Sequence, residues 1–366
     1  MISIPTRTLP TNPRRVLLIN PTKYLGNLLI AGGLIQEFAA QCRQQHTQFA
    51  VVLDAMFAGL VAPALEGVQV FWYPRQAVRR AAPWRQFTLW MDFVAQLRRF
   101  QADLAFNIEE DTLSSRLTQV SGAGFRLGSS PERHGFGFHA VVPVQHGTRH
   151  RWFGYQQVFT TLGMADVSTP SYMKLSQDQP DRALIQKLDE LGNQPDRPLI
   201  AIHPAATKDY KKWPEAAFTD LCKILISKGF QPALIGSGDA EFERCERIRV
   251  AASDGLSRAP LNLCNRLSLP ELAQFFRLCR GIVGNDSGPS HLASALGVPG
   301  VVIFGPSDPA IWQPLGRQTR VFRKAELCDP GCSRRTCLAT YRCLAAIRPE
   351  EVFAALEIQF IAGAHS

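Results

Sequence analysis

Hydrophobic and polar positions alternate along the chain in blocks about as long as one strand or one helix. Short runs of branched and aromatic residues end at polar or glycine-containing turns, and segments with apolar residues three and four positions apart follow them. The strands expected in the first half are Arg14–Asn20, Phe49–Leu53, Val68–Trp72 and Asp103–Ile108. Strands that alternate with helices predict a parallel sheet covered on both faces.

The alternation weakens over residues 166–181, a polar stretch with two prolines that is typical of an interdomain connection. It then resumes, with strands expected at Pro198–Ile202, Gln231–Ile235, Gly281–Gly284 and Val301–Phe304. We therefore expect an α/β protein with Rossmann-like domains over residues 1–170 and 171–348 and a terminal helix over 349–366. Ligands of such sheets bind beyond the carboxyl ends of the strands, where the polar motifs of this chain also fall.

The segment Gly281–Pro309 is the strongest candidate for a binding site. It predicts a strand, a polar turn at Asn285-Asp286-Ser287, a helix that begins at Gly288-Pro289, and a second strand followed by a second turn. Open N–H groups and the positive dipole end at Gly288 favour an anion such as a diphosphate. His291 lies in the first turn of this helix. Taken alone, the same turn also fits a capped surface helix with a satisfied histidine.

Two other loops follow expected strands of the second half. One runs from His203 to Pro214 and carries Thr207 and several lysines just before a Trp-Pro helix start; a lysine run is either an anion site or a solvated face. The other is the glycine-rich loop Gly236–Glu241, which ends with two acids at a helix start. Acids at a helix start either contact a ligand or only stabilise the helix by a favourable interaction with its dipole.

These segments together resemble the donor-site motifs of the heptosyltransferases, glycosyltransferase family 9, which transfer heptose from ADP-heptose during lipopolysaccharide core assembly. The resemblance covers most of the chain and implies the GT-B fold, with two domains facing a cleft. It implies no cofactor for catalysis, and the chain has no Asp-x-Asp metal motif. The donor-binding residues that it implies are Thr207, Lys211 (with Lys208 and Lys212 as substitutes), Asp239 or Glu241, Asp286, Ser287, Gly288 and His291.

The position of the catalytic base departs from the family pattern. In the family an aspartate follows glycine at the head of the first helix, whereas this chain has Gly26-Asn27. Asparagine caps a helix as well as aspartate does, but its amide accepts no proton near neutral pH, and a general base is worth ~10²–10⁴ in rate. Glu109, Glu110 and Asp111, after the strand Asp103–Ile108, are the alternative bases, or else a solvated turn.

The implied reaction is an inverting transfer of heptose from ADP-heptose to a sugar hydroxyl of the lipopolysaccharide inner core. Because of Asn27, one alternative is a sugar-nucleotide-binding protein without efficient turnover. The other alternative is a heptosyltransferase that acts on a protein or another acceptor.

Charge bears on the acceptor. The net charge is +9, and residues 1–170 hold 16 lysines and arginines against 10 acids. This suits an anionic glycolipid acceptor or an anionic membrane surface, and no nucleic-acid-binding motif accompanies it. The segment Phe71–Phe100 fits either such a surface or an ordinary helix. It combines Arg75, Arg79, Arg80, Arg85, Arg98 and Arg99 with Trp72, Tyr73, Trp84 and Trp90.

Neither a signal-peptide pattern nor an apolar run of about 18 residues is present, so we expect a cytoplasmic protein, peripheral on the inner membrane. In that compartment the nine cysteines are expected as thiols or metal ligands. A Cys-rich loop over residues 328–343 could close a structural zinc or iron site, or hold free or disulfide-forming thiols. Its cysteines are Cys328, Cys332, Cys337 and Cys343.

Overall fold

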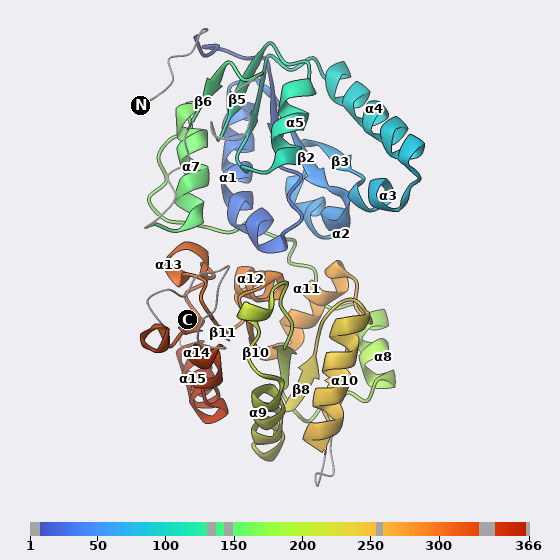
Figure 1. The fold of residues 1–366 in the computed structure, drawn as a ribbon, viewed down its shortest axis with the longest axis vertical. Coiled ribbons are helices and arrows are strands. Elements are labelled where there is room, and N and C mark those ends of the chain that lie inside the picture. Colours follow the sequence, from blue (N-terminus) through green and yellow to red (C-terminus); the bar gives the residue numbers. More distant parts are fainter. Residues whose placement is uncertain (1–7, 130–136, 143–148, 254–258, 329–340, 364–366) are drawn as a thin grey trace. The chain divides into compact units, whose positions relative to one another are not determined.

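The chain folds into two compact units, Met1–Ser176 and Gln177–Ser366 (Figure 1). The structure, a computed structural model, describes residues 8–129, 137–142, 149–253, 259–328 and 341–363. Residues 171–176, which the sequence places in the second domain, belong to the first unit. The N–H of Met173 donates to the carbonyl of Leu29 at 3.1 Å. This close approach requires Gly32 and Gly33, because a Cβ at either position would lie 2.4 Å or 2.6 Å from an atom of residues 171–173.

The sheet of unit 1 is entirely parallel, in the order β3-β2-β1-β4-β5-β6. This is the strand order 3-2-1-4-5-6 of the Rossmann fold, in which β1 and β4 lie side by side at the centre. Leu17 of β1 pairs with Ala50 of β2 on one side and Ala105 of β4 on the other. The strands are β1 Arg15–Ile19, β2 Gln48–Asp54, β3 Gln69–Tyr73, β4 Leu104–Asn107, β5 Phe125–Gly128 and β6 Ala140–Val141.

Helices cover both faces of this sheet, as the continuous apolar strands predict (Figure 1). On one face, Phe38 packs its ring 5.3 Å from Phe159 and 5.8 Å from Phe106. On the other face, Leu17 and Ile19 pack in one buried cluster with residues of the two helices that cover that face, among them Leu97 and Leu117. Helices α1 Leu25–Gln44 and α7 Arg151–Thr161 cover the first face; α4 Pro83–Arg99 and α5 Thr112–Val120 cover the second, and the shorter α2 Ala58–Val61 and α3 Arg75–Arg80 lie in the connections around β3.

Unit 2 repeats this topology. Its parallel sheet has the order β9-β8-β7-β10-β11-β12, again 3-2-1-4-5-6 when the strands are counted within the unit. The predicted fold class, α/β with two Rossmann-like units, is therefore confirmed. The strands are β7 Leu199–His203, β8 Gln231–Leu234, β9 Leu261–Asn262, β10 Cys279–Asn285, β11 Gly300–Ile303 and β12 Thr319–Phe322.

The terminal helix belongs to the core of unit 2. Leu356 and Phe360 lie in the same buried cluster as Ile200 and Val283 of the central strands. Among the described residues, no helix is both long and apolar enough to cross a membrane. The helices are α8 Arg182–Glu190, α9 Glu215–Ser227, α10 Asp239–Ser253, α11 Leu269–Leu278, α12 Gly288–Ala295, α13 Pro309–Trp312, α14 Arg342–Ala345 and α15 Pro349–Gly363.

Candidate functional site

In unit 2 the polar residues gather where β7 and β10 end. The order of the sheet reverses at these two neighbouring strands, and sheets of this kind bind ligands beyond the carboxyl ends of such strands. His203, the last residue of β7, is 4% exposed. Its Nδ1 lies 2.9 Å from the hydroxyl of Ser287, and its Nε2 lies 3.9 Å from a carboxylate oxygen of Glu241. His203, which the sequence analysis did not select as a ligand, therefore links the loop after β10 to the start of α10.

Lys211 and Asp286, both predicted to bind the donor, form an ion pair near these strand ends. The ammonium of Lys211 lies 2.5 Å from Oδ2 of Asp286. The Asp286 side chain is 6% exposed and that of Lys211 is 24% exposed. Because the carboxylate is buried and the ammonium still reaches solvent, Asp286 holds the charge of Lys211 where a ligand can reach it.

The loop that carries Lys211 is held by the side chain of Asn285, which is fully buried. Its Nδ2 donates to the carbonyls of Pro204 and Ala205 at 3.0 and 3.2 Å, and its Oδ1 accepts from the N–H of Trp213 at 3.0 Å. The loop is thus fixed at both ends. Sequence analysis predicted only a turn at Asn285, because these hydrogen bonds join residues more than seventy positions apart.

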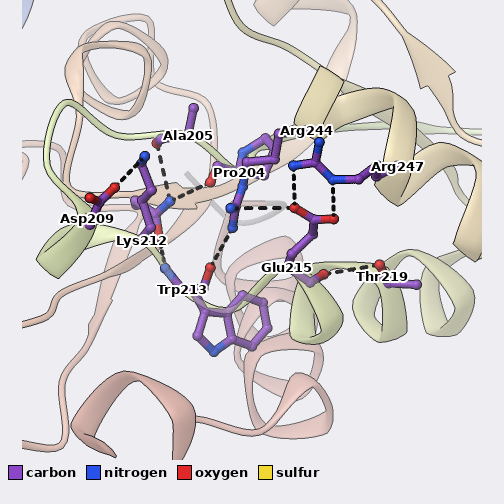
Figure 2. A network of polar contacts seen from close by, with 10 residues as sticks. Pro204, Ala205, Asp209, Lys212, Trp213, Glu215, Thr219, Arg244 and Arg247 are labelled. Atoms are coloured by element: carbon purple, nitrogen blue, oxygen red, sulfur yellow. Dashed lines mark hydrogen bonds and ion pairs between the residues drawn. The ribbon is translucent and has the colours of Figure 1, made fainter. Parts of the chain in front are cut away.

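Trp213 is the second anchor of this loop. Its indole is fully buried, stacks edge-on against Phe218 with ring centroids 4.8 Å apart, and donates to the carbonyl of Ile347 at 3.0 Å. Figure 2 shows Arg244 reaching the carbonyl of Trp213, at 2.9 Å, and Glu215. Packing and polar contacts therefore fix the backbone two residues after Lys211.

Of the two acids in the glycine-rich loop, Glu241 enters the network of contacts. Its Oε2 accepts from the N–H of Ser237 at 2.8 Å. Burial acts to raise the pKa of Glu241, but the contacts from His203, Ser237 and Lys212 outweigh it and lower that pKa. Asp239 is exposed as the first residue of α10, and Thr207 is also exposed.

Helix α12 starts without a side-chain cap. Ser287 occupies the N-cap position, but its side chain caps no N–H of the helix and contacts His203 instead. Gly288 begins the helix as predicted, and His291 in the first turn is 4% exposed. The helix N-terminus thus remains available to an anion beside the Lys211–Asp286 pair.

Unit 1 has its own polar cluster where β1 and β4 end, and Glu109 is its centre. Its Oε1 accepts from Nδ2 of Asn27 at 2.9 Å and from the hydroxyl of Tyr155 at 2.6 Å. Nη2 of Arg151 lies 3.6 Å from its Oε2. Asn27 is not a cap, because α1 begins at Leu25 with Tyr24 in the N-cap position. The helix starts earlier than predicted, and this turns Asn27 toward Glu109.

The three predicted alternative bases have different surroundings. Asp111 caps α5, accepting from the N–H groups of Leu113 and Ser114 at 2.9 and 3.1 Å. Glu110 is half-buried and has interactions of its own. Glu109 is the one that bonds to Asn27. Burial raises the pKa of Glu109, although Arg151, Tyr155 and Asn27 each act to lower it.

Arg75, expected among the phosphate-binding arginines, has an internal role. Its guanidinium forms an ion pair with the buried Asp54 and donates to the carbonyl of Pro21. It therefore holds the loop between β1 and α1 against the end of β2. We do not count Arg75 among the exposed arginines of this region.

The predicted metal site is only partly described. Cys332 and Cys337 lie outside the described residues. Cys328 is half-buried against the core of unit 2, and Cys343 in α14 is buried within it. In the part of the chain that the structure describes, no three His, Cys, Asp or Glu side chains are grouped to hold a metal ion.

The chain is similar to several known proteins. A model of glycosyltransferase family 9 (heptosyltransferase) matches residues 90–341. The chain is 32% identical to lipooligosaccharide heptosyltransferase 2 of Haemophilus ducreyi over 42% of this chain and 44% of that protein, so it spans less than half of that relative. It is 27% identical to lipopolysaccharide heptosyltransferase 1 of Pseudomonas aeruginosa over 86% and 90% of the two chains.

The fold agrees with this match. The structure of ADP-heptose LPS heptosyltransferase II from E. coli superimposes with a TM-score of 0.73 over 96% of this chain and 99% of that chain, at 20% identity. The family model covers well over half of the chain and includes every residue described above at the ends of β7 and β10. The chain therefore belongs to glycosyltransferase family 9, the heptosyltransferases.

Proposed function

We propose that this protein transfers heptose from ADP-heptose to a sugar hydroxyl of the lipopolysaccharide inner core, with inversion at the anomeric carbon. The observation that carries the proposal is the Lys211–Asp286 pair beside the start of α12, within a chain of this family. An ammonium and a helix N-terminus together stabilise the diphosphate that leaves as ADP. The relatives are named as heptosyltransferases of lipopolysaccharide or lipooligosaccharide.

We assign the donor contacts as follows. Lys211 and the N–H groups from Gly288 onward bind the diphosphate, with Thr207 as an additional hydroxyl donor. Glu241 accepts from the ribose hydroxyls, and the contacts from His203, Ser237 and Lys212 that lower its pKa favour the ionised carboxylate for this role. Asp286 holds Lys211 in place, and His291 and Ser287 line the sugar side. No metal or organic cofactor takes part in this chemistry.

The direct test is to incubate purified protein with ADP-heptose and truncated core acceptors and to follow ADP release and acceptor mass. Release of one ADP per heptosylated acceptor supports the proposal. Binding of ADP-heptose with no transfer to any acceptor would indicate a sugar-nucleotide-binding protein. Transfer to a protein hydroxyl alone would indicate a different acceptor class.

We also propose that the protein works as a peripheral protein on the inner membrane, where an anionic glycolipid acceptor lies. Helix α4 offers the apolar contact: Trp84, Phe87 and Met91 are 70%, 64% and 47% exposed and share one helical face. Around them, α3 and α4 carry the exposed Arg79, Arg80, Arg85, Arg98 and Arg99 against a single acid, Asp92. Exposed aromatics beside cations suit an anionic lipid interface.

Replacing Trp84 and Phe87 together by alanine should reduce binding to phosphatidylglycerol-containing vesicles about tenfold or more, because about 1.4 kcal/mol of lost burial already gives that factor. Co-sedimentation measures it. The matched control is Val250→Ala with Ile358→Ala, two exposed apolar residues of unit 2. Equal binding by the wild type and the α4 variant would contradict the proposed surface.

The Cys-rich loop is proposed to hold structural zinc or iron through Cys328, Cys332, Cys337 and Cys343. Purified protein should then contain about one equivalent of metal, and Cys332→Ser should lower that content. Elemental analysis measures this. Fully stable protein prepared without chelator and free of metal would show that these cysteines are thiols.

A further inference from the structure

We infer that Glu109 is the catalytic base of this enzyme and that Asn27 is its positioning residue. The inference rests on the proposed function and adds to it the group that takes the acceptor proton. The resemblance to the family implies that the base is an aspartate at the position that Asn27 occupies in this chain. Here the carboxylate comes instead from the loop after β4, and the amide of Asn27 holds it.

The topology supports this exchange. Asn27 follows β1 and Glu109 follows β4, the two central strands of unit 1, so both lie at the point where the strand order reverses. The main chain at Glu109 is itself fixed. Its carbonyl accepts from Nδ2 of Asn107 at 2.9 Å and from the hydroxyl of Ser129 at 3.1 Å. The carboxylate therefore starts from a rigid backbone, as a catalytic group requires.

The two oxygens of the carboxylate are in different situations. Oε1 accepts from both Asn27 and Tyr155, which occupies its two lone pairs. Oε2 accepts no hydrogen bond from the described residues, and Arg151 lies 3.6 Å from it, beyond hydrogen-bonding distance. The side chain is 12% exposed. Oε2 is thus the oxygen left to accept a proton from a bound hydroxyl.

The charge environment fits a base. The guanidinium of Arg151 and the hydrogen bonds from Tyr155 and Asn27 favour the ionised form of the buried carboxylate. Burial nevertheless raises its pKa, which makes it a stronger proton acceptor than an exposed glutamate. Asp111 lacks this environment, since its carboxylate is committed to capping α5.

In the transfer step, an oxygen lone pair of the acceptor hydroxyl forms a bond to the anomeric carbon of heptose. The bond from that carbon to the β-phosphate oxygen breaks, and its electron pair leaves with ADP. The hydroxyl proton passes to Oε2 of Glu109 and is returned to water after the products leave. One glycosidic bond replaces one glycosyl phosphate bond, and no other reactant is needed.

The same geometry explains why asparagine suits position 27. An aspartate there would place a second carboxylate about where the amide nitrogen lies, 2.9 Å from Glu109. Two carboxylates that close share one proton, so one of their pKa values rises. Because the base acts only when deprotonated, Asn27→Asp should move the acidic limb of the rate profile to higher pH.

The test compares Glu109→Gln with wild type and with Glu37→Gln, an exposed glutamate on α1. Glu109→Gln should lower kcat about 10²–10⁴-fold while leaving the Kd for ADP-heptose unchanged, because the proposed donor contacts lie in unit 2. Glu109→Asp should recover part of the rate. Asn27→Asp should shift the acidic limb upward, a change that a purely structural role of Asn27 would not produce. Unchanged donor binding shows that unit 2 of each variant is folded, and a circular dichroism spectrum and a thermal transition like those of the wild type show the same for unit 1, which carries the substitutions.

The outcomes separate the two levels of the proposal. If the wild type transfers heptose and Glu109→Gln does so at a similar rate, or if Glu110→Gln is the variant that abolishes transfer, the assignment of Glu109 is overturned and the proposed function stands. If the wild type transfers no heptose to any acceptor, the proposed function and this inference fail together.

Discussion

Trp213→Ala should lower the free energy of unfolding of unit 2 by about 3–5 kcal/mol, the usual cost of removing a fully buried aromatic side chain. The loss includes the packing against Phe218 and the hydrogen bond to the carbonyl of Ile347, which would be left buried without a donor. Urea denaturation followed by far-ultraviolet circular dichroism measures the change. We also expect weaker donor binding, since the loop of Lys211 loses an anchor.

Trp213→Phe is the control for this prediction. It keeps most of the packing and removes the indole N–H, so it should cost about 1–3 kcal/mol. A loss below about 1 kcal/mol for Trp213→Ala would show that the loop is not anchored through this side chain.

Lys211→Met should weaken ADP-heptose binding about 10- to 100-fold. Methionine keeps the apolar stem, so the change isolates the ammonium, and a hydrogen bond to a charged group is worth about 1.5–3 kcal/mol. The substitution also leaves the 6%-exposed carboxylate of Asp286 without its cation, which repels an incoming diphosphate. Isothermal titration calorimetry with ADP-heptose measures the affinity.

Lys228→Met, at the exposed C-cap of α9, is the matched control and should bind as the wild type does. Lys211→Arg should restore part of the affinity, because it returns a cation of different shape. The site assignment would be wrong if Lys211→Met and Asp286→Ala both bound ADP-heptose with wild-type affinity.

The sequence predicted the strands correctly where a continuous run of hydrophobic residues determines them. The buried runs of β1, β2, β7 and β11 have no polar residue at their centres, so a parallel sheet is the structure that hides them. The start of α1 was not predictable, because Tyr24 occupies the N-cap without a side-chain bond. The sequence carries no cap signal there.

The contacts of the site depended on strand order, which local pattern does not reveal. Once β7 and β10 are neighbours, His203 meets Ser287, and Asn285 reaches the carbonyls after β7. The same arrangement explains why Glu241, and not Asp239, contacts His203. Both residues lie in the first turn of α10, and Glu241 is the one whose side chain faces His203. The residue types at the strand ends indicated a binding site. Which of these residues contact one another could be seen only in the folded structure.

The strand order that both units share distinguishes residues at the central strands, which the polar contacts constrain, from residues at the edge of the sheet, which can vary. In each unit a polar pair joins the loops after the first and fourth strands, Asn27 with Glu109 and His203 with Ser287. Both pairs depend on the central strands alone. The edge strand β3, followed by α3 and α4, contributes no residue to either pair. A lineage or an engineer can therefore vary the exposed face of α4 while both polar pairs at the centre are inherited unchanged, provided that Arg75 of α3 is kept to hold the loop between β1 and α1.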